Sequence, residues 1–266
     1  MLLAELDYAR PGSIEEAVAL LAGREDARAL AGGQSLVNVM KTRVAAPELV
    51  VDLNGIESLR GITVASGALE LGAMTTYATI VDSPEVASAR PILAEVARTI
   101  ADVQVRNRGT IGGNVCSNDP TNHFPPLLAA LEAELTVQGA AGERTVGTDE
   151  FFEGVFMTAV QPGEVLTKVS IPAKGDARDG WASVTLGKDG TGIVNVAATV
   201  RDGTARIAIG CVAATPVVVT ASADETAVRD AVRAAELDPP ADVHASADYR
   251  RHLAEVLAAR AVREAR

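Results

Sequence analysis

The sequence has few cysteines, few aromatic residues and a shortage of positive charge. Its 266 residues include two cysteines, Cys116 and Cys211, which are too few for a four-cysteine iron–sulfur or zinc site. Aromatic residues make up 3% of the chain, too few for a stacking platform on single-stranded nucleic acid. With 24 basic against 35 acidic residues, the formal net charge of −11 repels phosphate backbones and anionic lipid. We therefore expect no nucleic-acid partner.

Long hydrophobic runs and targeting signals are missing as well. No window approaches the roughly 18 consecutive apolar residues that a membrane span requires. The first residues include Glu5 and Asp7, where a signal peptide carries basic side chains. We expect no membrane insertion and a cytoplasmic location.

Motifs of common catalytic and nucleotide sites are also absent. The chain contains no Gly-x-Gly-x-x-Gly, no P-loop Gly-Lys-Ser/Thr, no Gly-x-Ser-x-Gly and no His-Glu-x-x-His. The three histidines, His123, His244 and His252, are scattered, which favours structural or surface roles over metal binding. The sequence therefore predicts neither a metal site nor a catalytic side chain.

What is present indicates an α+β protein in three domains, predicted at 1–57, 58–175 and 176–266. Ser13 followed by Glu16 is a capping box that opens the first helix. In the last domain, Asp202-Gly203 between β-rich runs favours a type I′ hairpin, because both turn residues need positive φ. That domain is expected to hold antiparallel strands covered by helices.

Hydrophobic periodicity predicts the other helices and strands, and glycine and proline residues mark where they end. Segment 106–114 is predicted to be a long polar loop, and 172–180 a linker. The expected strands are 27–31, 49–53, 62–64, 68–71, 135–137, 165–171, 194–201 and 204–212. The expected helices are 36–42, from Thr75 or Thr76 to Val81, from Pro84 to Ile100, from Pro125 to about Glu134, and 245–266.

Two glycine pairs are the strongest candidates for a binding site. Gly32-Gly33 leads through Gln34-Ser35 into a predicted helix, and Gly112-Gly113 leads into Asn114. Consecutive glycines let main-chain N–H groups converge on an anion such as a pyrophosphate, and a helix start adds partial positive charge. Tight turns are the alternative, since roughly two adjacent pairs are expected by chance at this glycine content.

Few positively charged side chains lie in or beside the two glycine segments. Neither glycine segment contains a lysine, so the anion would be held by amides rather than by charged side chains. Arg106 and Arg108 flank the second segment, and contact with a phosphate, contact with another subunit and exposure to solvent all fit them.

The two segments resemble those of a known family. Leu30-Ala-Gly-Gly-Gln-Ser-Leu36, continuing through Met40-Lys41 to Pro47 and 50–53, resembles the start of the FAD-binding medium subunit of molybdenum hydroxylases. That is the carbon monoxide dehydrogenase and xanthine dehydrogenase family. Segment 104–114, with Asp119-Pro120 and Pro125, is similar to the second flavin loop of that subunit. Phe151-Phe152, 166–172 and 207–216 extend the likeness over nearly the whole chain.

The resemblance implies a two-part FAD-binding region of the PCMH type, followed by a C-terminal α+β domain, with FAD extended between the first two domains. Residues 31–35 and 110–114 would hold the pyrophosphate through main-chain N–H groups. Ile100 and Leu166 would lie beside the isoalloxazine ring. The cofactor-binding set implied in this way is Leu30, Ala31, Gly32, Gly33, Gln34, Ser35, Leu36, Ile100, Thr110, Ile111, Gly112, Gly113, Asn114, Asp119, His123, Leu166 and Lys188.

Three positions in this set depart from the family pattern. Gln34 replaces a His seen in some members, which a site made from amides should tolerate. His123 stands where the family usually has Asp, so a contact to the FAD ribose region is altered or is made by Asn122 or Asp119. The loop around Lys188 is about two residues shorter than in the family. Either Lys188 faces the flavin C2 carbonyl or it is an exposed loop lysine.

The implied function is electron transfer. The subunit would accept electrons from a [2Fe-2S] small subunit and pass them through FAD to an external acceptor, beside a molybdopterin large subunit in a dimer of heterotrimers. A self-contained FAD oxidase and a scaffold subunit that has lost FAD are the alternatives. If the glycines line a phosphate concavity, Gly33→Val or Gly112→Val should remove FAD and leave the fold intact.

Overall fold

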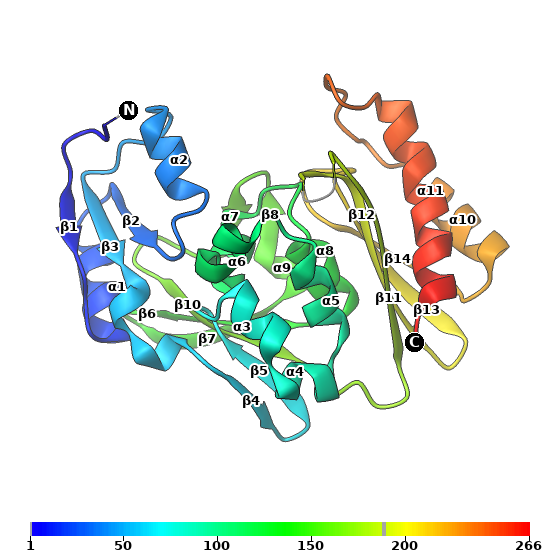
Figure 1. The fold of residues 1–266 in the computed structure, drawn as a ribbon, viewed down its shortest axis with the longest axis horizontal. Helices are drawn as coiled ribbons and strands as arrows, with labels where there is room; N and C mark the ends of the chain where they lie inside the picture. Colours follow the sequence, from blue (N-terminus) through cyan, green and yellow to red (C-terminus); the bar gives the residue numbers. More distant parts are fainter. Residues whose placement is uncertain (1, 188–189) are drawn as a thin grey trace.

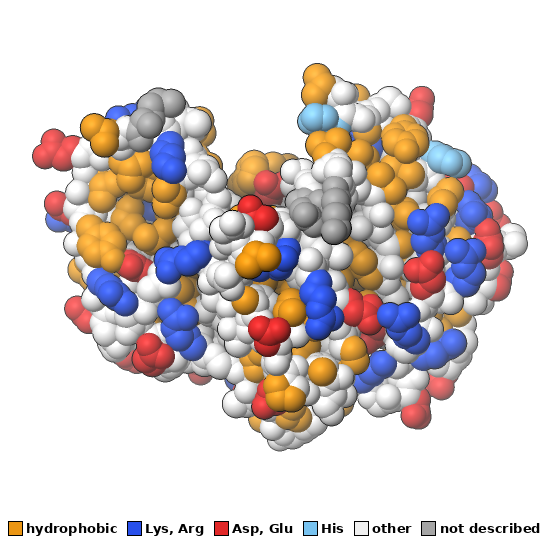
Figure 2. Space-filling view, viewed as in Figure 1, with side chains coloured by type: hydrophobic (Ala, Val, Ile, Leu, Met, Phe, Trp, Pro, Cys, Tyr) orange, Lys and Arg blue, Asp and Glu red, His pale blue; other side chains and the backbone are white. Residues whose placement is uncertain are grey.

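The computed structural model describes residues 2–187 and 190–266. Three parts follow one another from left to right in Figure 1, with the N-terminus on the left and the C-terminus on the right. Their sheets occupy residues 7–52, 62–171 and 178–222. The N-terminal and C-terminal parts rise on either side of a hollow above the middle part (Figure 2). The sheets fall within the predicted domain ranges, whose limits stay a prediction.

The N-terminal part is a small parallel sheet with a helix packed on it. Its elements are β1 (Asp7–Ala9), α1 (Ile14–Ala22), β2 (Ala27–Leu30), α2 (Leu36–Lys41) and β3 (Leu49–Asp52), with the strands in the order β1-β3-β2. The Ser13 half of the predicted capping box is confirmed, because the Glu16 amide donates to Ser13 Oγ at 3.2 Å, while the Glu16 carboxylate accepts from the Gly12 amide at 2.9 Å rather than from that of Ser13. Two 3-10 turns, η1 (Leu53–Gly55) and η2 (Glu57–Leu59), lead into the middle part.

The middle part combines a sheet in the order β4-β5-β10-β6-β7 with a set of short helices. Its strands are β4 (Ile62–Ala65), β5 (Ala68–Gly72), β6 (Glu134–Gly139), β7 (Gly142–Gly147), β10 (Val165–Ile171) and the separate pair β8 (Phe152–Gly154) and β9 (Met157–Thr158). Its helices are α3 (Tyr77–Asp82), α4 (Pro84–Ala89), α5 (Ile92–Arg98), α6 (Val103–Arg108), α7 (Ile111–Ser117), α8 (Phe124–Ala130) and α9 (Thr148–Phe151). Apolar side chains from helices α3, α5, α7 and α8 and from strands β5, β6 and β10 share one hydrophobic core. This core fixes the helices that carry the second glycine pair.

The predicted polar loop at 106–114 is wrong. Residues up to Arg108 belong to α6, and α7 begins at Ile111. The Thr110 hydroxyl caps α7 by accepting from the Gly113 amide at 3.1 Å. Two adjacent glycines disfavour a helix by roughly 1 kcal/mol each relative to alanine, which is why the sequence pattern indicates a loop. The cap and the surrounding core override that preference.

Two other predicted boundaries also shift. Helix α8 begins at Phe124 and ends at Ala130, four residues before the predicted end at Glu134. Glu134 instead starts β6. The predicted linker 172–180 is shorter, because its last residues already pair in the C-terminal sheet.

The C-terminal part is an antiparallel sheet in the order β11-β12-β13-β14. Its elements are β11 (Arg178–Thr185), β12 (Gly192–Arg201), β13 (Thr204–Gly210), β14 (Val217–Ser222), α10 (Glu225–Ala234) and α11 (Ala247–Glu264). Every residue of β12 except Arg201 is buried, since α11 packs with this strand and α8 of the middle part contacts it as well. The predicted hairpin is confirmed by φ values of 50° at Asp202 and 76° at Gly203.

A buried ion pair joins the middle and C-terminal parts. Arg90, at the end of α4, places Nε 2.9 Å from Oδ2 of Asp179 on β11, and the two side chains are 3% and 2% exposed. Asp179 Oδ1 also accepts from the Thr199 hydroxyl at 3.1 Å, and Arg90 Nη1 donates to the Pro172 carbonyl at 3.2 Å. Burial lowers the pKa of Arg90, while Asp179 opposes that effect. The pair fixes the C-terminal sheet against the helices of the middle part.

Candidate functional site

The first glycine segment joins the end of β2 to the start of α2. Gly33 has φ +73°, a left-handed conformation that glycine adopts without strain. The main-chain N–H groups of Gly33, Gln34, Ser35 and Leu36 donate to no acceptor among residues 2–187 and 190–266. Unpaired amides on consecutive residues form a suitable site for an anion. This segment therefore offers the donors that the sequence predicts for a pyrophosphate.

The second glycine segment does not offer its amides in the same way. The Ile111 and Gly112 amides donate to the carbonyls of Thr75 (3.0 Å) and Ala73 (2.8 Å). The amides of the next two residues, Gly113 and Asn114, both bond to Thr110, one to its hydroxyl and one to its carbonyl. The expectation that 110–114 presents free amide donors is therefore met only at Thr110, whose amide donates to no acceptor among the described residues. The structure requires glycine in this second segment for a different physical reason.

That reason is close packing between segments that are far apart in the sequence. A Cβ added at Gly32 would overlap the carbonyl of Arg108, and one at Gly113 would lie 3.3 Å from Cβ of Ala31. A Cβ at Gly112 would lie 2.6 Å from the Ala73 carbonyl oxygen. The structure thus brings the two glycine segments into contact, as the sequence predicts.

A cavity of about 290 Å³ opens beside the first segment. Its lining residues come from β2, α2, the end of β3 and the end of α6. They are Leu30, Ala31, Gly32, Gly33, Gln34, Val37, Asn38, Lys41, Asp52, Asn54 and Arg108. The Asn54 amide group ties this wall together by donating to the Ala31 carbonyl at 2.9 Å and to Asp52 Oδ1 at 2.6 Å. Phosphate-sized anions fit both the space and the free amides that line it.

In this wall, Lys41 was given no role by sequence reasoning, and Arg108 was left open between contact with a phosphate, contact with another subunit and exposure to solvent. The signal for Lys41 was its spacing, because Val37 and Lys41 are four residues apart on α2 and so share a helix face. Arg108 enters from α6, a helix that the sequence did not predict. Both supply positive charge where amides alone were expected.

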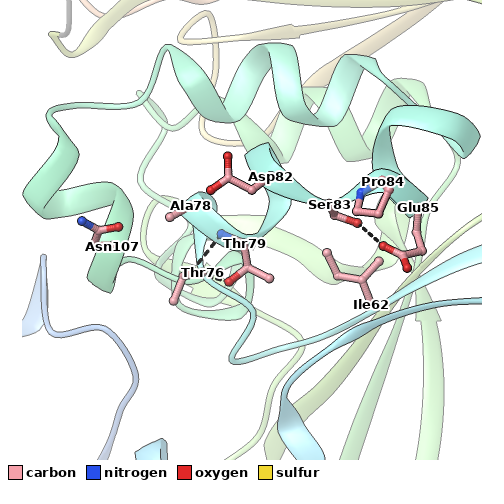
Figure 3. Close-up of a pocket in the computed structure, with 9 residues that line it drawn as sticks. All are labelled: Ile62, Thr76, Ala78, Thr79, Asp82, Ser83, Pro84, Glu85 and Asn107. Carbon is pink, nitrogen blue, oxygen red and sulfur yellow. Dashed lines mark hydrogen bonds between the residues drawn. The ribbon is translucent and has the colours of Figure 1, made fainter.

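A second cavity, of about 560 Å³, has different chemistry. It lies between β4, α3, the start of α4 and α6, and Figure 3 shows its lining side chains. Two carboxylates, Asp82 and Glu85, line it, and no Lys or Arg is among the lining residues that the structure describes. The Ser83 hydroxyl donates to Glu85 at 2.7 Å, and Thr76 caps α3 (Figure 3). This cavity is larger but is unsuited to a pyrophosphate.

The other predicted cofactor residues lie in three places. Leu166 on β10 is 4% exposed and belongs to the middle core, and Ile100, which follows α5, is partly buried and packs against that core. Asp119 Oδ1 accepts from the amide and the hydroxyl of Thr121, at 2.9 and 2.7 Å. Lys188 lies outside the described residues. Ile100, Leu166 and Asp119 do not line the 290 Å³ cavity, so their contact with a flavin stays a proposal.

His123 is buried at the boundary between the middle and C-terminal parts. It is 5% exposed and stacks on Trp181 of β11, with ring centroids 5.6 Å apart. Its Nε2 has no hydrogen-bond partner in the part of the chain that the structure describes. Burial lowers the pKa of His123 to about 4. The imidazole is therefore neutral at pH 7 and faces a ring rather than the cavity.

This burial predicts an acid-dependent loss of stability. Between pH 6.5 and about 4, the unfolded chain takes up a proton at His123 that the folded chain does not accept. The free energy of unfolding should fall by about 3 kcal/mol over this range, in addition to the carboxylate contribution. His123→Phe keeps an aromatic ring against Trp181 and removes the titration. Urea unfolding at a series of pH values should show that the free energy of unfolding falls less steeply with decreasing pH in this variant than in the wild type. Equal pH dependence in the two proteins would contradict the prediction.

The chain is similar to known proteins in sequence and in structure. Residues 4–174 match the family described as "FAD binding domain in molybdopterin dehydrogenase". The carbon monoxide dehydrogenase medium chain of Afipia carboxidovorans is 39% identical over 284 residues, covering 100% of this chain and 98% of that one. The nicotine 6-hydroxylase medium subunit of Paenarthrobacter nicotinovorans is 34% identical, covering 100% and 99%. A solved structure of reconstituted CO dehydrogenase from Oligotropha carboxidovorans superposes with a TM-score of 0.95 at 36% identity, covering 100% and 99%.

The fold and the family match are those of an α+β FAD-binding oxidoreductase subunit. The chain belongs to the family of FAD-binding domains of molybdopterin dehydrogenases. The predicted family, fold class and cofactor, FAD, are thereby confirmed. Among the described residues, no helix is both long and apolar enough to span a membrane.

Proposed function

We propose that this chain is the FAD-carrying electron-transfer subunit of a molybdenum-containing hydroxylase or dehydrogenase. The observation that carries the proposal is the contact between the two glycine segments beside a cavity with unpaired amides. It occurs in a chain that matches medium subunits of this family from end to end. When bound, FAD supplies storage for two electrons that can be accepted and released singly.

The chain's own residues bind and orient this cofactor. The amides of 33–36, which have no acceptor among the described residues, would hold the pyrophosphate, and the Arg108 carbonyl packed on Gly32 holds the first segment against the middle part. Thr110 keeps α7 in place by capping it. Ile100 and Leu166 would exclude water from the apolar side of the flavin ring. Asp119 and Asn122 would provide polar contacts to the ribose region in place of His123, which is stacked on Trp181.

The proposed partners are a [2Fe-2S] small subunit that delivers electrons and a molybdopterin large subunit that oxidises the substrate, assembled as a dimer of heterotrimers. Support comes from the relatives, which are named medium chain and medium subunit. Those two relatives are named for carbon monoxide and nicotine, although both align over 100% of this chain. Complexes named for very different substrates thus contain similar flavin subunits. We therefore assign substrate selection to another subunit of the complex. The electrons would leave FAD to an external acceptor.

The absorption spectrum of the purified chain tests this proposal. Bands near ~370 and ~450 nm are expected, either as isolated or after addition of FAD. A protein that stays colourless with added FAD would instead support a scaffold subunit. Bleaching of the flavin by an alcohol or amine with this chain alone would support a self-contained oxidase. Bleaching only in the presence of the partner subunits and their substrate is the result that the electron-transfer proposal predicts.

A further inference from the structure

Two basic side chains from different elements meet at the 290 Å³ cavity. Lys41 is the last residue of α2, and Arg108 is the last residue of α6. Both are exposed, and within residues 2–187 and 190–266 neither side chain forms an ion pair or a hydrogen bond. Arg106, two residues before Arg108, differs because its Nη1 donates to the carbonyls of Ile100 (3.0 Å) and Ala101 (2.6 Å). The two cations at the cavity are therefore available to a ligand.

The backbone holds both cations at the free amides of the first segment. The Arg108 carbonyl lies where a Cβ of Gly32 would be, so α6 ends against this segment. On α2, the Asn38 side-chain amide donates to the Gln34 carbonyl at 2.8 Å, which fixes the first turn of the helix that ends at Lys41. Lys41 and Arg108 thus line the same cavity as Gly33 and Gln34, from two different helices.

The acidic group in the same wall is already engaged within the protein. Asp52 accepts from the Tyr8 hydroxyl at 2.5 Å and from the Asn54 amide at 2.9 Å. Burial raises the pKa of Asp52, but the hydrogen bonds from Tyr8 and Asn54 outweigh it and leave the pKa below its usual value. The carboxylate therefore stays charged, with both oxygens paired, and the wall carries one more positive than negative charge. In a chain of net charge −11, this local excess favours an anionic ligand.

Resting on the proposed FAD site, we infer that Lys41 and Arg108 bind the pyrophosphate of FAD through charge and make the site selective for phosphate-bearing ligands over riboflavin. Arg108 suits phosphate oxygens because its guanidinium presents a planar fork of donors. Lys41 contributes a compact charge on a flexible stem. Charge-assisted hydrogen bonds of this kind are about twice as strong as neutral ones. The amides orient the pyrophosphate, and the two side chains provide most of its electrostatic affinity.

Titration of the flavin-free, full-length chain with FAD tests this inference, with flavin fluorescence as the readout. Lys41→Gln and Arg108→Gln should each weaken FAD binding about tenfold, and the double variant about a hundredfold. Wild-type affinity should fall as salt increases, and the double variant should show a flatter dependence. ADP should compete with FAD for the wild type and compete poorly for the double variant. Riboflavin affinity should be the same in all of these proteins.

Arg263→Gln, an exposed substitution on α11, is the matched control because it removes the same charge away from the cavity. Lys41→Arg and Arg108→Lys keep the charge and should retain FAD binding. Equal FAD affinity and equal salt dependence in the wild type and the double variant would overturn the inference while the proposed function stands. Failure of the wild type itself to bind FAD would overturn the proposed function.

Discussion

Asp179→Ala is expected to lower the free energy of unfolding by about 3–5 kcal/mol, one of the two largest effects predicted for this chain. The substitution leaves the guanidinium of Arg90 buried at 3% exposure without its counter-charge. It also removes the acceptor of the Thr199 hydroxyl. Burial already lowers the pKa of Arg90 in the intact protein, so the remaining charge is costly. Urea unfolding monitored by circular dichroism measures the loss.

The matched control is Asp248→Ala. Asp248 pairs with Arg251 at 2.8 Å on α11, and these side chains are 97% and 45% exposed. Exposed pairs contribute about 0–1 kcal/mol, because water screens the charges and the long side chains lose entropy on pairing. A double variant, Arg90→Met with Asp179→Leu, should recover part of the lost stability, since it removes both buried charges. Equal losses in Asp179→Ala and Asp248→Ala would show that the buried pair does not hold the two parts together.

Local signals in the sequence predicted much of the fold. The Ser13 cap and the Asp202-Gly203 turn depend on neighbouring residues alone, and the structure confirms both. The division between α6 and α7 was missed, because helix propensity at Gly112-Gly113 points the other way. What makes that segment helical is contact with Ala73, about forty residues earlier in the chain. Propensity cannot report such a contact.

The candidate site shows the same limit. The glycine pairs alone left tight turns as an alternative, and it was the family resemblance that implied a shared pyrophosphate for both segments. The resemblance assigned the same role to both, whereas among the described residues all four amides of 33–36 are unpaired and the amides of 111–114 are not. Which amides are free depends on the neighbouring carbonyls, such as those of Ala73 and Thr75, and these are set by tertiary packing. Lys41 and Arg108 reach one cavity for the same reason.

Gly112→Val separates these two interpretations of the second glycine segment. If Gly112 lined a phosphate concavity, as the sequence suggests, the variant would fold normally and lose FAD. In the structure an added Cβ would lie 2.6 Å from the Ala73 carbonyl oxygen and 2.7 Å from its Cβ. The Gly112 amide donates to that same carbonyl at 2.8 Å, so a shift that relieves the overlap also breaks this bond. We therefore expect a loss of at least about 3 kcal/mol in the free energy of unfolding.

The measurement is urea unfolding in the absence of FAD, so that lost cofactor affinity cannot contribute. Gly12→Val is the control, because a Cβ at Gly12 meets no atom within 4 Å and the stability should stay near that of the wild type. A Gly112→Val protein that unfolds at the wild-type urea concentration but no longer binds FAD would support the interpretation that Gly112 lines a phosphate concavity. A valine side chain that faced only the ligand would not lower the stability of the FAD-free protein. Low stability of Gly112→Val without FAD would therefore show that Gly112 is needed for packing, and that the amides of 33–36 hold the anion.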